Sequence, residues 1–165
     1  MFTIGDLIIY SAHGICRVDD ICEKTVSGMT RPYYVLHPIE NNHQLTISTP
    51  VNNNKVVMLE LIHQEGANEI LESFKDPGIK WVDNPNIRYR LYSDIINTGD
   101  RKEIALVVNT LMAEKMEVEL HGRKLYEQDR KLLTTTQNIL FKELAISLKT
   151  TFEEINDRVI RLIKG

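Results

Sequence analysis

The stretch Leu-Ile-Ile-Tyr at residues 7 to 10, followed by Ser-Ala-His-Gly at residues 11 to 14, sets the pattern of the first third of the chain. Short runs rich in β-branched and aromatic residues alternate there with turn-forming residues. Further runs lie at residues 15–21, 33–36 and 45–47, and turns at residues 27–28 and 40–43. Strands at this spacing predict a small SH3-like or Tudor-like β-barrel of about 60 residues, because closure hides strand edges that would otherwise pair with other chains.

After Gln64 the spacing of apolar residues becomes helical. Residues 79–86 are irregular, because Pro85 cannot continue a helix that precedes it. Gly99 ends one helix, Asp100 caps the next, and a capping box at residues 150–154 begins the last. The expected helices span residues 65–74, 88–97, 100–118 and 126–148, with a last one after residue 150. The sequence therefore predicts an α+β chain, a small β-barrel at residues 1–62 followed by a compact bundle of about five helices at residues 63–165.

The charges are unevenly divided along the chain. The net charge is −3. Residues 1–75 hold 5 basic and 9 acidic side chains, whereas residues 76–165 hold 15 basic and 14 acidic side chains. Neither half is the strongly basic body expected of a protein that binds DNA unaided. The first residues do not resemble a signal peptide, and the apolar runs are too short to span a bilayer. We therefore expect a cytoplasmic protein without a membrane partner.

Residue types that carry catalysis are scattered. The histidines lie at positions 13, 37, 43, 63 and 121 without metal-ligand spacing, and neither a phosphate-binding loop nor a nucleophile-elbow motif occurs. Cys16 and Cys22 form no metal or redox motif and are expected as reduced thiols. We expect no catalytic residue, no metal, no cofactor and no small-molecule substrate. A small hydrolase would be supported only by a pocket in which a histidine and a carboxylate converge.

Several segments, taken in order, resemble the CarD family, also called CdnL, and its polymerase-interacting module. The matching segments are residues 2–10, 13–14, 33–36, 64–66, 88–90, 98–100 and 139–145, with Pro50 at the end of the barrel. The resemblance implies a Tudor-like barrel that binds the β subunit of RNA polymerase by adding an edge strand. It also implies a helical domain that contacts promoter DNA at the upstream edge of the bubble and stabilises the open complex. That DNA contact can be weak and largely independent of sequence, because a tether to polymerase raises the effective concentration.

The resemblance also assigns residues. Lys24 and Val26 match the family's polymerase contact, whereas Ser48 stands where the family has a second basic residue. Trp81 resembles the family's minor-groove wedge, but it lies seven residues before Arg88 instead of about three. Packing between modules is the alternative for this tryptophan.

Basic residues of the second half are candidates for phosphate contacts, and Tyr89 and Tyr126 lie near them in sequence. The candidates are Arg88, Arg90, Arg123, Lys124, Arg130 and Lys131. Because the second half is nearly neutral, an alternative remains: a protein–protein adaptor whose helical half binds protein instead of DNA.

Overall fold

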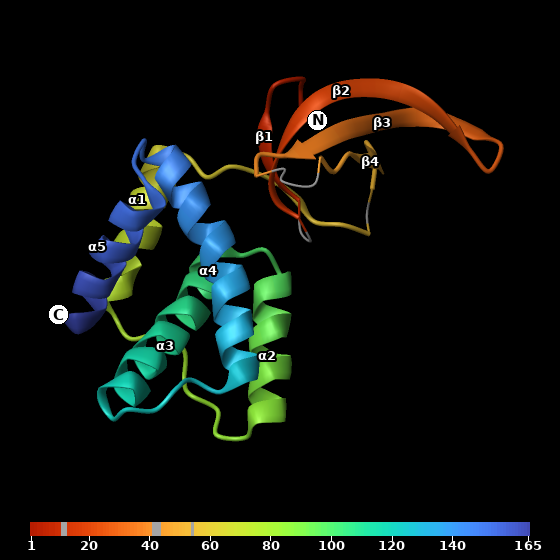
Figure 1. The fold of residues 1–165 in the computed structure, drawn as a ribbon. Helices are drawn as coiled ribbons and strands as arrows, with labels where there is room; N and C mark the ends of the chain where they lie inside the picture. Colours follow the sequence, from red (N-terminus) through yellow and green to blue (C-terminus); the bar gives the residue numbers. More distant parts are fainter. Residues whose placement is uncertain (11–12, 41–43, 54) are drawn as a thin grey trace. The chain divides into compact units, whose positions relative to one another are not determined.

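The computed structural model describes residues 1–10, 13–40, 44–53 and 55–165. The chain divides into two compact units, Met1–Leu61 and Ile62–Gly165 (Figure 1). The predicted turns at residues 11–14 and 40–43 fall partly outside the described residues.

The first unit is an antiparallel sheet whose strands, among the described residues, follow the order β4-β3-β2-β1-β5. These strands are β1 (Leu7–Tyr10), β2 (Gly14–Val26), β3 (Met29–Pro38), β4 (Ile47–Pro50) and β5 (Met58–Glu60). The expected Tudor-like fold is confirmed. Strands β2 and β3 are longer than the predicted runs at residues 15–21 and 33–36. Strand β4 begins at Ile47, where the predicted run 45–47 ends, and β5 has no counterpart among the predicted runs.

The core of this sheet follows the alternation of side chains along each strand. Ile8, Cys16, Val18, Tyr34 and Leu36 are almost fully buried. These apolar side chains form the core of the first unit, and burial also raises the pKa of the Cys16 thiol to about 11. Cys16 is therefore an inert core residue, as expected for a reduced thiol.

The hairpin of β2 and β3 extends beyond the rest of the sheet (Figure 1). The described part of the chain pairs β1 with β2 only from Gly14 to Arg17, and β4 with β3 only from Tyr33 to Leu36. At the tip, Ser27 and Gly28 both have positive φ, as a two-residue turn between twisted strands requires. The outer part of the hairpin is thus a two-stranded ribbon.

The second unit contains five α-helices and one 3-10 turn within the described residues, which confirms the predicted bundle. Its elements are α1 (Gln64–Glu72), η1 (Ser73–Lys75), α2 (Pro85–Asn97), α3 (Arg101–Leu120), α4 (Glu127–Ser147) and α5 (Phe152–Lys164). Helix α2 begins three residues earlier than predicted. Asn84 caps its first amides, and proline is favourable at the first helical position.

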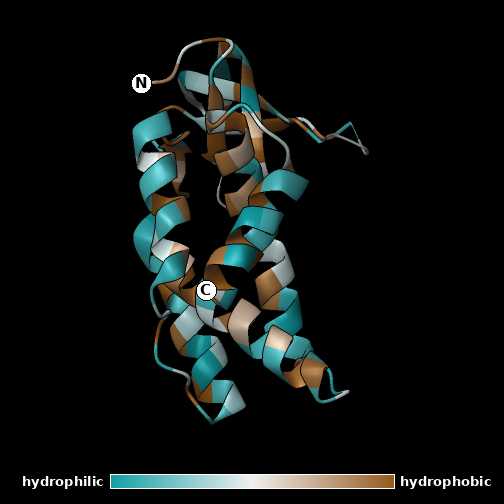
Figure 2. Cartoon of the chain, turned by 90° about the vertical axis from the view of Figure 1, so that its left-hand side faces the viewer, coloured by the Kyte–Doolittle hydropathy of each residue, from teal (hydrophilic) through white to brown (hydrophobic). Residues whose placement is uncertain are grey.

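The helices bury one shared apolar core (Figure 2). Phe74, Leu111, Phe141, Leu144 and Ile155 are almost fully buried there, and hydrophilic residues lie on the outward faces. In the part of the chain that the structure describes, no helix is long and apolar enough to cross a membrane.

Candidate functional site

The irregular segment between η1 and α2 is fixed by side-chain hydrogen bonds to its backbone carbonyls. From α3, Asn109 donates to the Asp76 carbonyl at 2.8 Å and Thr110 donates to the Ile79 carbonyl at 2.6 Å. From α2, the Tyr92 hydroxyl donates to the Lys80 carbonyl at 2.8 Å. The segment is therefore held in one conformation although it is neither helix nor strand.

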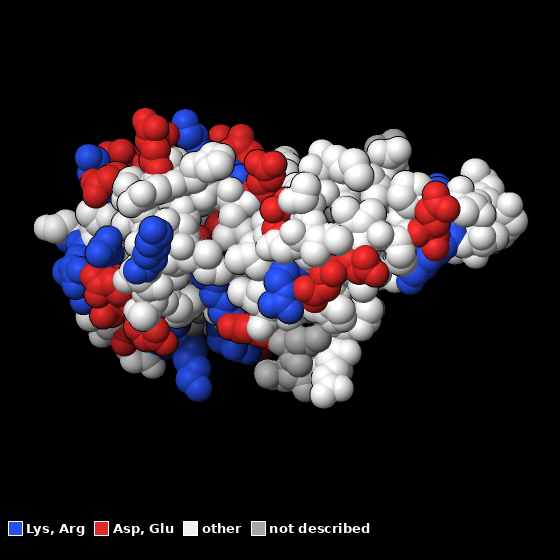
Figure 3. Space-filling model, turned by 90° about the horizontal axis from the view of Figure 1, so that it is seen from above, with Lys and Arg blue, Asp and Glu red and all other residues white. Residues whose placement is uncertain are grey.

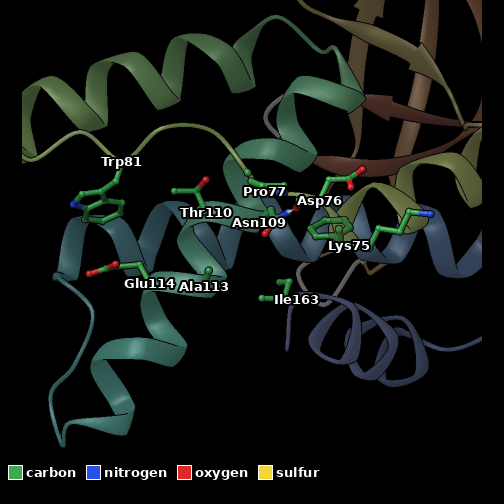
Figure 4. Close-up of a pocket in the computed structure, with 11 residues that line it drawn as sticks. Lys75, Asp76, Pro77, Trp81, Asn109, Thr110, Ala113, Glu114 and Ile163 are labelled. Carbon is green, nitrogen blue, oxygen red and sulfur yellow. Dashed lines mark hydrogen bonds between the residues drawn. The ribbon is translucent and has the colours of Figure 1, made fainter. Parts of the chain in front are cut away.

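Trp81 lies on this fixed segment. Its indole is half-buried, packs against the apolar core, and lies under the Arg88 guanidinium, whose Cζ is 4.2 Å from the ring centroid. Figure 4 shows Trp81 above Glu114 at one end of a hollow of about 490 Å³. The ring thus packs within the helical unit and keeps the partial exposure that a wedge requires, and its packing against this core is not the packing between modules named as the alternative.

Arg88 is buried, with 3% of its surface exposed. Its Nε and Nη2 donate to the two carboxylate oxygens of Asp129 at 2.9 and 2.5 Å, and its Nη1 donates to the carbonyls of Val82 and Asp83. The Asp129 carboxylate raises the pKa of Arg88 above its ordinary value. The expectation of a phosphate contact is therefore corrected: this guanidinium is enclosed in the protein and holds Trp81, α2 and α4 together.

The other expected phosphate contacts lie on the surface. Arg90 is exposed on α2, and Arg123 and Lys124 are exposed in the loop before α4. Arg130 is exposed but forms an ion pair with Glu127, whereas Lys131 lines a hollow between α2 and α4. Figure 1 shows that the loop and the beginnings of α2 and α4 lie at one end of the helical unit.

Of the three residues expected to contact polymerase, Lys24 and Ser48 are in direct contact, and Val26 lies further along the same hairpin. Lys24 on β2 donates from Nζ to the Ser48 hydroxyl on β4 at 2.6 Å. Val26 is 49% exposed at the hairpin tip, opposite Met29, which is 62% exposed. Figure 3 shows an uncharged tip, whereas basic and acidic side chains are interspersed over the helical unit. The tip combines an apolar end, a nearby lysine and strand edges beside which, within the described residues, no further strand is paired.

A histidine and a carboxylate do meet on the sheet. His37 contacts Asp19 through Nδ1 and the Thr46 hydroxyl through Nε2, the latter at 3.1 Å. Arg17 also binds Asp19, and its hydrogen bond, followed by that of His37, keeps the pKa of Asp19 below its usual value. Since Asp19 serves Arg17 as well as the histidine, we interpret the cluster as a link between β2, β3 and the segment before β4.

Within the described residues, no group of three histidine, cysteine or acidic side chains is placed to hold a metal ion.

Sequence reasoning missed two buried carboxylates on α4. Besides Asp129, Glu143 is buried and accepts from the Ile62 amide at 2.8 Å and from Arg101 Nε at 2.9 Å. Both occupy positions on the inward face that α4 otherwise fills mainly with leucine and phenylalanine. The sequence did carry a signal for them: an acidic residue within the apolar stripe of a helix indicates a buried carboxylate, and a buried carboxylate requires a partner.

Two family models match the chain. The model described as CarD-like/TRCF RID domain matches residues 2–62, and the model described as CarD, C-terminal domain, matches residues 69–160. A protein of Bacillus subtilis (strain 168) named "Putative transcription factor YdeB" is 28% identical over 158 residues, which cover 94% of this chain and 97% of that protein.

Proposed function

The chain belongs to the CarD family of transcription factors, and from this premise we propose that it binds the β subunit of RNA polymerase and promoter DNA at the same time. In this proposal it stabilises the open complex by contacting DNA at the upstream edge of the bubble. The observation that carries the proposal is that, among the described residues, one chain combines a strand edge with no strand paired beside it in its sheet with exposed cations at one end of its helical unit.

The outer part of β2 is our candidate for the polymerase contact. Residues 19–26 extend beyond the pairing with β1, and among the described residues no strand pairs with them on that side, so their outward backbone groups could pair with a strand of the partner, apart from the Ile21 amide, which donates to the Asp20 carboxylate. Lys24 and Val26 lie within this part, and Ser48 orients the lysine through its hydroxyl. Backbone hydrogen bonds would supply affinity, and these side chains would supply charge and apolar contact.

The end of the helical unit that carries the N-termini of α2 and α4 is our candidate for the DNA contact. Arg90, Arg123, Lys124 and Lys131 are exposed at or near this end and would contact phosphates. Arg130 would join them by exchanging Glu127 for a phosphate. Trp81, held by its fixed segment, would act as the wedge in the minor groove. Few free cations are needed, because the tether to polymerase raises the effective concentration of DNA.

Capture of RNA polymerase by the immobilised full-length chain tests the polymerase contact. We expect Lys24→Glu to weaken capture several-fold and to change its salt dependence, because the substitution reverses the charge beside the pairing edge. Lys55→Glu is the matched control, since Lys55 is exposed in the same unit but lies outside the hairpin. Equal capture by all three proteins would exclude this edge as the interface.

A further inference from the structure

A second hollow, of about 780 Å³, lies between the first turns of α2 and α4. Two tyrosines line it from positions far apart in sequence: Tyr89 on α2 is 41% exposed, and Tyr126, which precedes α4, is 57% exposed. The rings of the four other tyrosines are buried: Tyr10, Tyr33, Tyr34 and Tyr92. The two exposed rings therefore form an aromatic surface that the fold itself does not use.

The remaining lining is suited to a nucleotide. Asn86 and Gln128 provide amides that can donate to and accept from the edges of a base, and Lys131 provides a cation for a phosphate. Leu132 is the one aliphatic hydrocarbon side chain among the lining residues, so the apolar part of the lining comes mainly from the two tyrosine rings, which are flat surfaces on which a base can stack.

The local charge is positive. Glu127 is the acidic residue of the lining, and it is held by Arg130 through two hydrogen bonds. Arg130, Lys131 and Lys124 all act on Glu127 to lower the pKa of its carboxyl group. Three cations around one carboxylate favour a polyanion over an acidic or neutral peptide.

We propose that this hollow binds unpaired bases of single-stranded DNA, with Tyr89 and Tyr126 as stacking platforms and Lys131 on the adjoining phosphate. Stacking on exposed aromatic rings together with a positive groove is the usual chemistry of single-strand binding, and it tolerates any sequence. The inference rests on the proposed function and deepens it: the helical unit would hold a melted strand of the bubble as well as the duplex beside it.

The test is the affinity of the full-length chain for a labelled oligothymidine of about 12 nucleotides, within the usual site sizes of single-strand binders, and for a duplex of equal length. We expect Tyr126→Ala and Tyr89→Ala each to weaken single-strand binding about ten-fold, in line with the loss of one stacked base, and to change duplex binding much less. Tyr126→Phe should bind like the parent, because the ring remains. Leu120→Ala is the control, since Leu120 is exposed but does not line the hollow.

Parent-like single-strand affinity in both alanine variants would overturn the inference, as would an equal loss for single strand and duplex. Loss of polymerase capture with unchanged DNA affinity would make the hollow a protein-docking site instead, which also overturns it. These outcomes differ from failure of the proposed function, which appears as unchanged polymerase capture by Lys24→Glu whatever the oligonucleotide affinities are.

Discussion

Arg88 shows how a single residue organises the candidate DNA contact. A guanidinium removed from water is stable only with a partner of matching geometry, and the two oxygens of Asp129 provide one. The same group covers one face of Trp81. The position of the tryptophan therefore depends on a carboxylate that lies 48 residues further along the chain.

We expect Asp129→Asn to lower the free energy of unfolding of the helical unit by about 3 kcal/mol, because it leaves a buried guanidinium without its countercharge. Urea denaturation followed by the fluorescence of Trp81, the only tryptophan, reports this change from within the helical unit. Glu127→Gln is the control, because it removes an exposed partner of Arg130 on the same helix. A urea midpoint equal to that of the control would show that the buried pair of Arg88 and Asp129 contributes little to the free energy of unfolding.

Sequence reasoning found Arg88 but assigned it to the wrong environment. Basic residues on helices are usually solvated, and the sequence does not show which one meets a carboxylate 41 positions away. Arg88 and Tyr92 are one helical turn apart, and both are buried. The sequence places Tyr89 and Tyr126 near the cations, but only the adjacent positions of α2 and α4 bring the two rings to one hollow.

At the scale of elements, the segment between η1 and α2 depends on close backbone contact with α3. A Cβ added to Gly78 would lie 2.3 Å from Thr110 Oγ1 and 2.7 Å from the Leu106 carbonyl oxygen. Only glycine fits at position 78, so Gly78 fixes how the segment that carries Trp81 crosses helix α3.

We expect Gly78→Ala to lower the stability of the helical unit by about 2 to 3 kcal/mol, because either the segment or the Thr110 hydrogen bond must move. Gly66→Ala is the matched control. Its Cβ would meet only the flexible side chain of Ile62, and alanine favours helix α1, so a net change within about 1 kcal/mol is expected. Urea midpoints by tryptophan fluorescence compare the two, and a larger loss in the control would contradict this account.

Helices were predicted better than strands, for a physical reason. Caps such as Asp100 and Thr151 act locally, and the structure has both at the expected helix starts. The length of the β2–β3 hairpin depends on cross-strand pairs such as Thr25 with Thr30, whose hydroxyls share a hydrogen bond and which no local propensity specifies. Strand β5 is three residues long, and its pairing with β1 joins segments about 50 residues apart.

In the proposed function, the whole molecule combines two modest binding surfaces. Its helical unit mixes acidic and basic side chains, so we expect weak DNA binding by the free protein. In this proposal, attachment to polymerase would make the DNA contact intramolecular, and the two contacts would then stabilise the same complex. Charge and composition cannot reveal this arrangement, because it depends on the partner.

The lifetime of open promoter complexes after addition of a DNA competitor tests this account most directly. We predict that the full-length chain prolongs the lifetime about five-fold, equivalent to about 1 kcal/mol, and that Lys24→Glu loses most of this effect at the same concentration. Lys55→Glu should act like the parent. An identical lifetime with and without the parent chain, while the chain remains bound to polymerase, would contradict the proposal that it stabilises the open complex.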